Sequence, residues 1–367
     1  MALASHTPAT WDSILSTTLH NYRKSLTDNI FNSRPLLEFF MSNGRLRTID
    51  GGISIVEPLL LGPGEANSYG PWQQISVNAV SGISAAQFAW RQLYATIIIS
   101  GLEEAQNNGK EMMISLLEAK VMQAENTLKN VLVQMLYGTR GGGALATDFT
   151  ALTTLIDATA AAGGITPAAS PAPENVWRSP TWDASANTGT DAVGGAITIP
   201  GGAMTSPYDG SELERVLRHM YMLSSDGGSD HVTAIFAGIG WFEAYEASLT
   251  PQVRYTDTTK ANLGFQNLMF KNVPIMWDPD CPTGTALGLN SQYLGITVHS
   301  DRNFTQSPFT NNLSGTVSST ANANPGATPA APAANTIDAR VSFITTYGNT
   351  TTRERRRNFK ITGATFS

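Results

Sequence analysis

The sequence predicts an α+β fold in which helices and strands do not follow a regular alternation. Three observations lead to this prediction. Apolar residues recur every three to four positions from residue 109 to 137, as in a long helix, and two extended runs flank a turn rich in glycine and proline. Helix and strand patterns then follow in mixed order from residue 141 onward. A chain of 367 residues, 41% of them hydrophobic, also has enough apolar side chains for a sizeable core.

Charged residues make up only 14% of the chain, whereas about 25% is usual in soluble domains. The 33 glycines and 19 prolines suit β structure, long ordered loops and a surface covered by neighbouring subunits. This composition excludes a collagen, a coiled coil and a chain kept disordered by its charge.

The net charge of −6 is unevenly distributed. Residues 1–50 hold five basic and four acidic side chains, and residues 337–367 hold six basic and two acidic ones. The segment between them holds 12 basic and 23 acidic side chains. A nucleic-acid-binding domain usually shows a basic face, and here only Arg353–Arg357 qualifies. We interpret that segment as one face of a strand that makes ion pairs, with contact to nucleic acid as the alternative.

Several classes of protein are not expected. No apolar run approaches the length of about 20 residues that spans a bilayer, and the first residues lack the basic start and apolar core of a secretory signal. The single cysteine, Cys281, excludes an internal disulfide, and we expect it to be a small buried side chain in a protein made in the cytoplasm.

Residues 1–48 have the spacing of short helical turns, interrupted around Asn32, Ser33 and Pro35. Their apolar side chains, including Trp11 and Tyr22, exceed what so short a segment buries alone. We predict a partly helical arm that needs a partner.

Residues 53–61 are predicted to form a strand, which Pro58 restricts to an edge or a bulge. A second extended run, residues 85–100, follows a turn that carries Tyr69 and Trp72. The two runs predict a projecting β-hairpin. Because a two-stranded hairpin is marginally stable in water, it also needs a partner to lie on.

The long helix is predicted over residues 109–137, with Asn108 and Glu111 as a capping pair and Gly138 as its carboxyl-terminal stop. Further helices are predicted at 149–156, 208–223 and 241–249, and further strands at 231–240, 273–277, 293–299, 339–347 and 352–366. Two stretches of low charge interrupt them, 158–205 and 303–337, and the second has no charged residue at all. It is predicted to be an ordered loop pressed against another protein, with disorder as the alternative.

No pattern predicts catalysis, a cofactor or a metal. The chain lacks a phosphate-binding glycine motif and a Gly-x-Ser-x-Gly elbow. Its histidines do not have the spacing of metal ligands: His6, His20, His219, His231 and His299. Asp278 and Asp280 could act as an acid–base pair or bind a divalent ion, but an Asp-Pro turn that leaves a strand explains them better.

The order of these segments resembles the major capsid proteins of tailed bacteriophages, which share the Hong Kong 97-type fold. The segments that carry the resemblance are Glu103–Gly109, Leu263–Asp278 and Leu289–Ile296. The resemblance implies an N-terminal arm at 1–48, an extended hairpin loop at 49–86, a peripheral domain from 87–140 and 337–367, and an axial domain at 141–336. The spine helix of the peripheral domain would be 109–137, and the low-charge insertions would lie near 158–205 and 303–336.

The resemblance also implies a function. The chain would be a structural subunit, not an enzyme, that assembles into hexamers and pentamers of an icosahedral head around double-stranded DNA. A scaffolding protein, a portal and a decoration protein would be its partners, it would contact the packaged DNA non-specifically, and it would assemble in the host cytoplasm. The alternatives are an encapsulin-type nanocompartment shell and, more remotely, a hydrolase that uses Asp278 and Asp280.

Contacts between subunits are predicted at the aromatic residues of the arm and hairpin and at the arginine segment. These residues are Trp11, Tyr22, Tyr69, Trp72, Arg353, Arg355, Arg356 and Arg357. The arginines are predicted to alternate between the two faces of a strand, one face making ion pairs and the other meeting a subunit boundary or the genome. Some relatives join the extended loop to a neighbour by a lysine–asparagine isopeptide bond, but this chain has no lysine from residue 25 to 109. A shell without such cross-links is therefore expected.

Overall fold

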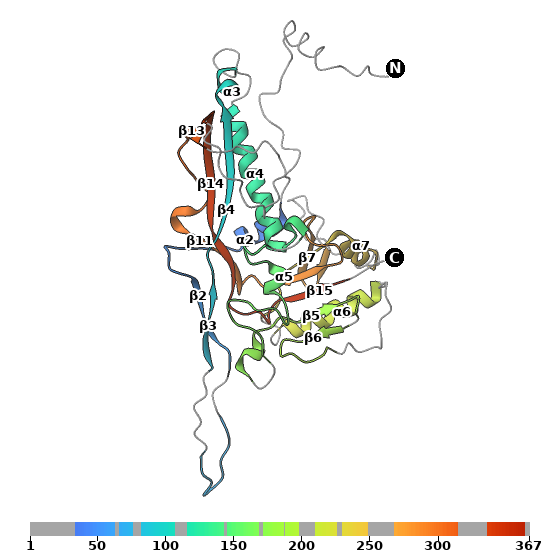
Figure 1. Cartoon of the computed structure of the whole chain (residues 1–367). Coiled ribbons are helices and arrows are strands. Elements are labelled where there is room, and N and C mark those ends of the chain that lie inside the picture. Colours follow the sequence, from blue (N-terminus) through green and yellow to red (C-terminus); the bar gives the residue numbers. More distant parts are fainter. Residues whose placement is uncertain are drawn as a thin grey trace, which may run out of the picture. The chain divides into compact units, whose positions relative to one another are not determined.

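A computed structural model describes residues 34–62, 66–75, 82–106, 116–142, 145–168, 172–186, 188–197, 210–225, 230–248, 268–314 and 336–363 (Figure 1). The chain forms two compact units. Of the described residues, the first comprises those within 96–126 and 307–343, and the second comprises those within 33–95, 127–306 and 344–367. Helix α4 (Leu116–Tyr137) and strands β4 (Arg91–Ser100) and β14 (Thr336–Thr352) each contain residues of both units.

A seven-stranded mixed sheet lies in the second unit. Its order is β6-β5-β15-β10-β7-β9-β8. The strands are β5 (Thr181–Asp183), β6 (Thr188–Thr190), β7 (Ala234–Ala237), β8 (Leu268–Phe270), β9 (Val273–Trp277), β10 (Ala286–Leu289) and β15 (Phe359–Thr362). β15 pairs in parallel with β5 and antiparallel with β10, so a strand from near the carboxyl end of the sequence lies inside the sheet.

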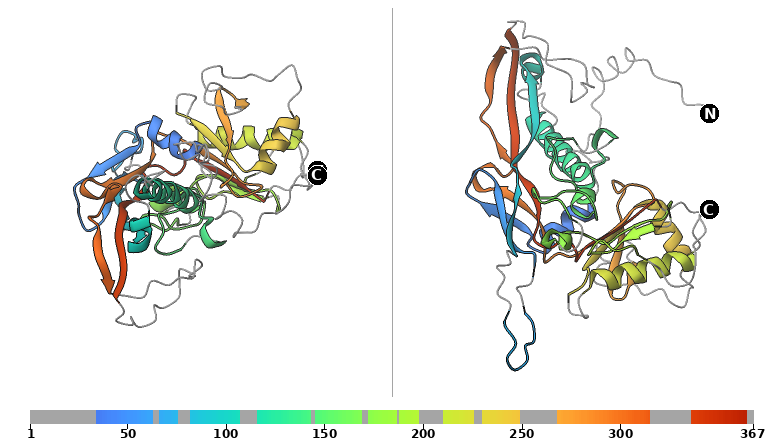
Figure 2. Two further views of the ribbon diagram at one scale, coloured as in Figure 1. Left: turned by 90° about the horizontal axis from the view of Figure 1, so that it is seen from above. Right: turned by 60° about the horizontal axis from the view of Figure 1, so that its bottom comes forward.

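Helices α6 (Gly210–Ser224) and α7 (Ile239–Ser248) pack on this sheet and on each other (Figure 2). Apolar side chains from both helices and from the strands form one buried cluster, with Trp241 and Phe359 fully enclosed. Helices α6 and α7 and strand β9 match the predicted elements at 208–223, 241–249 and 273–277. Strand β7 is shorter than the predicted 231–240, because α7 already begins at Ile239, and β8 was not predicted.

A second sheet of six strands is built around β14. β1 (Leu46–Ile49) pairs in parallel with β11 (Leu294–His299), and β11 pairs antiparallel with β14. β12 (Thr305–Gln306), β13 (Thr310–Ser314) and β4 also pair with β14. Residues 305–314 belong to the uncharged stretch at 303–337, so this part of it is ordered as strands.

The predicted hairpin is present, but its second strand is shorter than expected. β2 (Ile55–Leu60) and β3 (Ile83–Phe88) form a separate antiparallel sheet, in which Pro58 lies on an edge strand opposite Ala85. The extended run at 85–100 is not one strand. It breaks at Ala89 and Trp90 and continues as β4, which belongs to the six-stranded sheet.

Helix α4 ends as the sequence predicts. Gly138 has a φ of 73°, the backbone N–H of Gly138 donates to the carbonyl of Met135, and that of Thr139 donates to the carbonyl of Gln134. This is a Schellman motif, which satisfies carbonyl groups in the last turn. The predicted start at 109 and the capping pair at Asn108 and Glu111 lie outside the described residues.

In the described part of the arm, one face of a short helix is buried in its own unit. Helix α2 (Pro35–Ser42) begins at Pro35. Proline suits the first turn, because an N–H group at that position would have no partner within the helix. A helix that begins at Pro35 agrees with the interruption predicted around Asn32, Ser33 and Pro35, of which Asn32 and Ser33 lie outside the described residues. Leu36 and Phe40 are almost fully buried, and Phe39 packs on Phe236 with ring centroids 5.4 Å apart.

The shorter helices are α3 (Gly101–Gln106) and α5 (Leu152–Leu155). Strand β15 lies in one sheet with strands from residues 141–336, and β11 pairs with β14. The domain boundaries stay a prediction. Within the described ranges, no helix combines the length and the apolarity that crossing a bilayer requires.

Candidate interaction surfaces

The tip of the hairpin carries a tryptophan at a position that normally needs glycine. The backbone N–H of Gln73 donates to the carbonyl of Gly70 over 3.1 Å, which closes a turn with Pro71 and Trp72 in the middle. Trp72 has a φ of 70°, as the third residue of a type II turn requires. A bulky residue with positive φ costs about 1–3 kcal/mol. The turn therefore holds this indole at a cost in stability.

The hairpin exposes apolar side chains. Trp72 and Tyr69 are 104% and 69% exposed. Val56, Pro58 and Leu60 point outward from β2, and Ile83 lies opposite Leu60 on β3 and is 80% exposed. Large apolar surfaces of this kind mark contact sites between proteins. The structure thus leaves Tyr69 and Trp72 available for the contacts predicted for them.

The other face of β2 holds a buried carboxylate that the sequence analysis did not single out. Glu57 is 3% exposed and lies between the buried Ile55 and Leu59. Arg47 Nη1 donates to Glu57 Oε1 over 2.7 Å, and Arg353 Nε donates to Oε2 over 3.0 Å. A charged residue in phase with the inward positions of a strand is the signal that could have identified it.

The arginine segment is not a strand, which corrects the sequence analysis. β14 ends at Thr352 and β15 begins at Phe359, and residues 353–358 form turns between them. The arginines therefore do not alternate between two faces. Each has a different environment, set by its own partners.

Arg355 is 1% exposed and donates all five of its N–H groups to backbone carbonyls. The acceptors, at 2.7–3.1 Å, are the carbonyls of Thr154, Leu155, Asp157, Ala160 and Trp177. Burial lowers the pKa of Arg355 to about 10, so the group stays charged at neutral pH. Its guanidinium is enclosed by its own chain, and it cannot make the subunit contact predicted for it.

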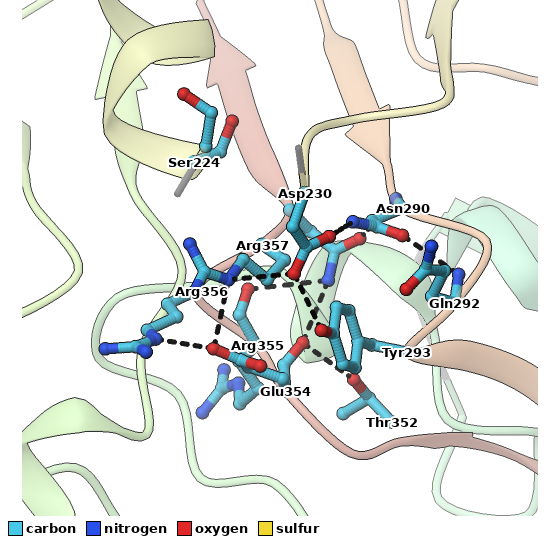
Figure 3. A network of polar contacts seen from close by, with 12 residues as sticks. Ser224, Asp230, Asn290, Gln292, Tyr293, Thr352, Glu354, Arg355, Arg356 and Arg357 are labelled. Carbon is cyan, nitrogen blue, oxygen red and sulfur yellow. Dashed lines mark hydrogen bonds and ion pairs between the residues drawn. The ribbon is translucent and has the colours of Figure 1, made fainter. Parts of the chain in front are cut away.

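Arg357 is also buried, in a polar network with Asp230 (Figure 3). Its Nε lies 3.5 Å from Asp230 Oδ2 and 3.2 Å from Glu354 Oε1. Asp230 also accepts hydrogen bonds from the Tyr293 hydroxyl at 2.7 Å and the Asn290 amide at 2.8 Å. The hydrogen bond to Asp230 raises the pKa of Tyr293 to about 12. This network holds the turn after β14 against residues 290–293.

The two remaining arginines of the segment are more accessible. Arg356 donates to Glu354 over 2.5 Å with its side chain 43% exposed, and Arg353 pairs with Glu57 with its side chain 58% exposed. Contact of Arg353 and Arg356 with a neighbouring subunit or DNA stays a prediction. Trp11 and Tyr22, the predicted contacts of the arm, lie outside the described residues, as do His6 and His20.

Asp278 and Asp280 do not form an accessible acid–base pair. Asp278 is fully buried and accepts hydrogen bonds from the Tyr137 hydroxyl at 3.1 Å and the backbone N–H of Asp280 at 3.0 Å. Asp280 makes an ion pair with Arg34, which also donates to Asn130 over 2.6 Å. Burial raises the pKa of both carboxyls. A substrate has no route to Asp278, so these residues form the structural turn that the sequence favoured.

Nothing else in the described ranges suggests a catalytic or metal centre. No group of three or more potential metal ligands comes together there, and His219, His231 and His299 belong to no such group. Cys281 is buried, as expected, and burial raises the pKa of its thiol. A buried protonated thiol is a poor nucleophile.

Comparisons with known proteins give a clear result for the fold. The chain is similar to the capsid asymmetric unit of cyanophage A-1(L), with 15% identity, a TM-score of 0.60, and 95% and 97% of the two chains covered. It is also similar to the capsid protein of a native GTA particle, with 9% identity and a TM-score of 0.57. That match covers 99% of this chain and 100% of the other. The capsid of Myoviridae phage XM1 matches with 10% identity and a TM-score of 0.52, over 94% of this chain and 96% of the other.

The chain has the fold of a phage capsid subunit. The similarity covers nearly the whole chain, so the α+β capsid-protein fold expected from the resemblance is confirmed. No protein-family model matches the chain, and no curated protein does either. Because only 9–15% of the residues are identical, the similarity lies in the arrangement of the backbone and not in the amino-acid sequence.

Proposed function

We propose that the chain is the major capsid protein of a tailed bacteriophage, a non-enzymatic subunit whose copies form the icosahedral head around double-stranded DNA. The observation that carries this proposal is the fold match over at least 94% of both chains to subunits of phage and phage-like capsids. The exposed apolar hairpin supports it, because self-assembly gives such a surface a partner. The low content of charged residues is also explained if neighbouring subunits cover much of the surface.

The partners of the subunit follow from this role. Copies of the chain would form the hexamers and pentamers of the shell, and the virion would be its final location. A scaffolding protein, a portal and a decoration protein would join during assembly in the host cytoplasm. The packaged DNA would be contacted non-specifically, because the chain is acidic overall and has no basic domain for reading a sequence.

Electron microscopy of the purified full-length protein tests the proposal. The expected result is closed icosahedral particles, alone or on co-expression with the other head proteins of the same virus. Particles from infected cells should contain double-stranded DNA. A shell filled with an enzyme and free of DNA would instead identify an encapsulin-type compartment, and a monomer in every condition would contradict the proposal.

The hairpin tip provides a residue-level test. Trp72→Ala and Trp72→Gly both remove the indole, whereas glycine also suits the positive φ of the turn. Both variants should keep the melting temperature of the unassembled subunit, and the glycine variant should keep it or raise it. We expect both to raise the subunit concentration needed for assembly at least tenfold, measured by light scattering.

If the indole contacts no neighbour, both variants will assemble like the wild type. A matched control is Trp277→Ala, which removes a 40% exposed tryptophan from the end of β9. An equal assembly defect in that control would show that the effect is not specific to the hairpin.

A further inference from the structure

The β2–β3 hairpin forms its own two-stranded sheet and is attached to the second unit near its base. The backbone N–H of Gln87 donates to the carbonyl of Gly163 over 2.8 Å. Just outside the strands, the Trp90 indole donates to the carbonyl of Gly52 and the Asn349 amide donates to the carbonyl of Ala89, both over 2.8 Å. These single hydrogen bonds hold the backbone at points around the base.

Glu57 makes a different kind of attachment. It lies within β2 itself, it is charged and buried, and each of its two oxygens is bound by a different arginine. Arg47 comes from β1, and Arg353 comes from the turn after β14. The carboxylate therefore links the hairpin to two separate segments of the six-stranded sheet region at one point.

A neutral residue could not replace this contact. A glutamine amide of the same shape has one acceptor oxygen, and its NH₂ group would face the N–H of the second guanidinium. A tilt of the hairpin would likewise separate Glu57 from at least one arginine. A buried carboxylate that loses its partner is strongly destabilised, so the arrangement opposes a tilt in either direction.

We propose that Glu57 is a positioning residue, which fixes the direction of the β2–β3 hairpin within the second unit by holding Arg47 and Arg353 together. The hairpin then has one orientation in the free subunit. Such preorganisation reduces the ordering cost of association. The consequence for assembly rests on the proposed function, whereas the orientation of the hairpin is a property of the subunit alone.

Distance measurements between spin labels test the proposal directly. Labels at Ser68→Cys and Thr147→Cys, in a Cys281→Ala background, report on the hairpin and on the body of the second unit, and both sites are exposed. The wild-type background should give one narrow distance distribution. We expect Glu57→Gln to widen that distribution at least twofold while the circular dichroism of the subunit is unchanged.

Glu214→Gln is the matched control. It removes the same charge from an exposed ion pair with Arg218 on α6, where the side chain of Glu214 is 45% exposed. The distribution should stay narrow in this control. If Glu57→Gln is as narrow as the wild type, the proposal is wrong.

A second variant keeps the test decisive if Glu57→Gln does not fold. Arg353→Gln removes a 58% exposed side chain and leaves Arg47 in place, so the subunit should fold and the distribution should widen to a lesser extent. An unchanged distribution in this variant also overturns the proposal. Assembly is measured separately, so a wild-type subunit that never forms shells would contradict the proposed function without affecting this result.

Discussion

At the scale of single residues, Arg355 shows how a buried cation is held without a carboxylate among its direct partners. Its five donors meet five backbone carbonyls from residues 154–177. Two of these carbonyls, from Thr154 and Leu155, lie at the carboxyl end of α5. Carbonyl groups at this end have no partner within the helix, and their partial negative charge favours a cation. The planar fork of a guanidinium can reach all five, whereas an ammonium group has only three donors.

Arg355→Lys should therefore lower the free energy of unfolding by about 3 kcal/mol, because at least two buried carbonyls lose their partner. Urea denaturation of the unassembled subunit measures this. Arg356→Lys is the control, since that side chain is 43% exposed, and it should change stability by less than about 0.5 kcal/mol. Equal effects in the two variants would contradict the structural role of Arg355.

Asp157 predicts a pH dependence. Burial alone would raise its pKa, but hydrogen bonds from Lys360 and the backbone N–H groups of Thr159 and Ala160 outweigh burial and lower it to about 2. The unfolded value is about 3.9, so the folded state binds fewer protons. The stabilisation is complete above about pH 4 and is lost as the pH falls through about 2.

Between pH 5 and pH 2 the wild type should therefore lose on the order of 1–2 kcal/mol more stability than Asp157→Asn, allowing for the partial exposure of the carboxyl. Denaturation curves at several pH values measure the difference. Parallel pH profiles for the two proteins would show that Asp157 is not the responsible group.

At the scale of elements, the contact between the hairpin and the loop around Gly163 can be tested. A Cβ on Gly163 would lie 2.6 Å from the Cβ of Ala86 on β3, and the φ of Gly163 is 60°. Gly163→Ala should destabilise the subunit by about 2–4 kcal/mol, from backbone strain and from displacement of the hairpin.

The neighbouring Gly164 separates these two causes. Its φ is 76°, but a Cβ there would meet nothing within 4 Å. Gly164→Ala should therefore cost only the strain, about 1–2 kcal/mol. If both variants have the same melting temperature, the hairpin does not pack on Gly163 as described.

The elements that local chemistry specifies were predicted from the sequence, and those that tertiary pairing specifies were not. The helix stop at Gly138 and the strand at 273–277 follow from residue type and periodicity. The break at Ala89 and Trp90 is not marked by a glycine or proline in the sequence. It arises because the two halves of the extended run pair in two different sheets. The turn at 353–358 likewise follows from the partners of Arg355 and Arg357, which are far away in sequence.

The same division applies to the candidate contact surfaces. The exposure of Tyr69 and Trp72 follows from a turn rich in glycine and proline, so both could be predicted. The burial of Arg355 could not be predicted, since arginine is usually exposed and its carbonyl partners, in α5 and the segment after it, lie more than 170 residues away in sequence. Composition identifies a charged segment, but it does not say which charges face solvent.

At the scale of the whole molecule, the absence of lysine from residue 25 to 109 bears on how a shell is held together. An isopeptide bond from the hairpin loop needs an amine, and this loop has none to offer. We expect mature particles to dissociate on boiling in detergent into a single band near 39 kDa. Repeated weak contacts between symmetric copies would then hold the shell. A ladder of larger bands that resists reductant would contradict this.

The central place of β15 in the seven-stranded sheet has a consequence for synthesis. β15 separates β5 from β10, and the Ser179 hydroxyl bonds to the carbonyl of Arg355, 176 residues later in the chain. During translation, β5 and β10 therefore leave the ribosome long before the strand that joins them. A polypeptide that terminates before residue 354 retains two unpaired strand edges, which proteases and chaperones recognise. We therefore expect prematurely terminated chains to be removed before they can enter an assembly of many copies.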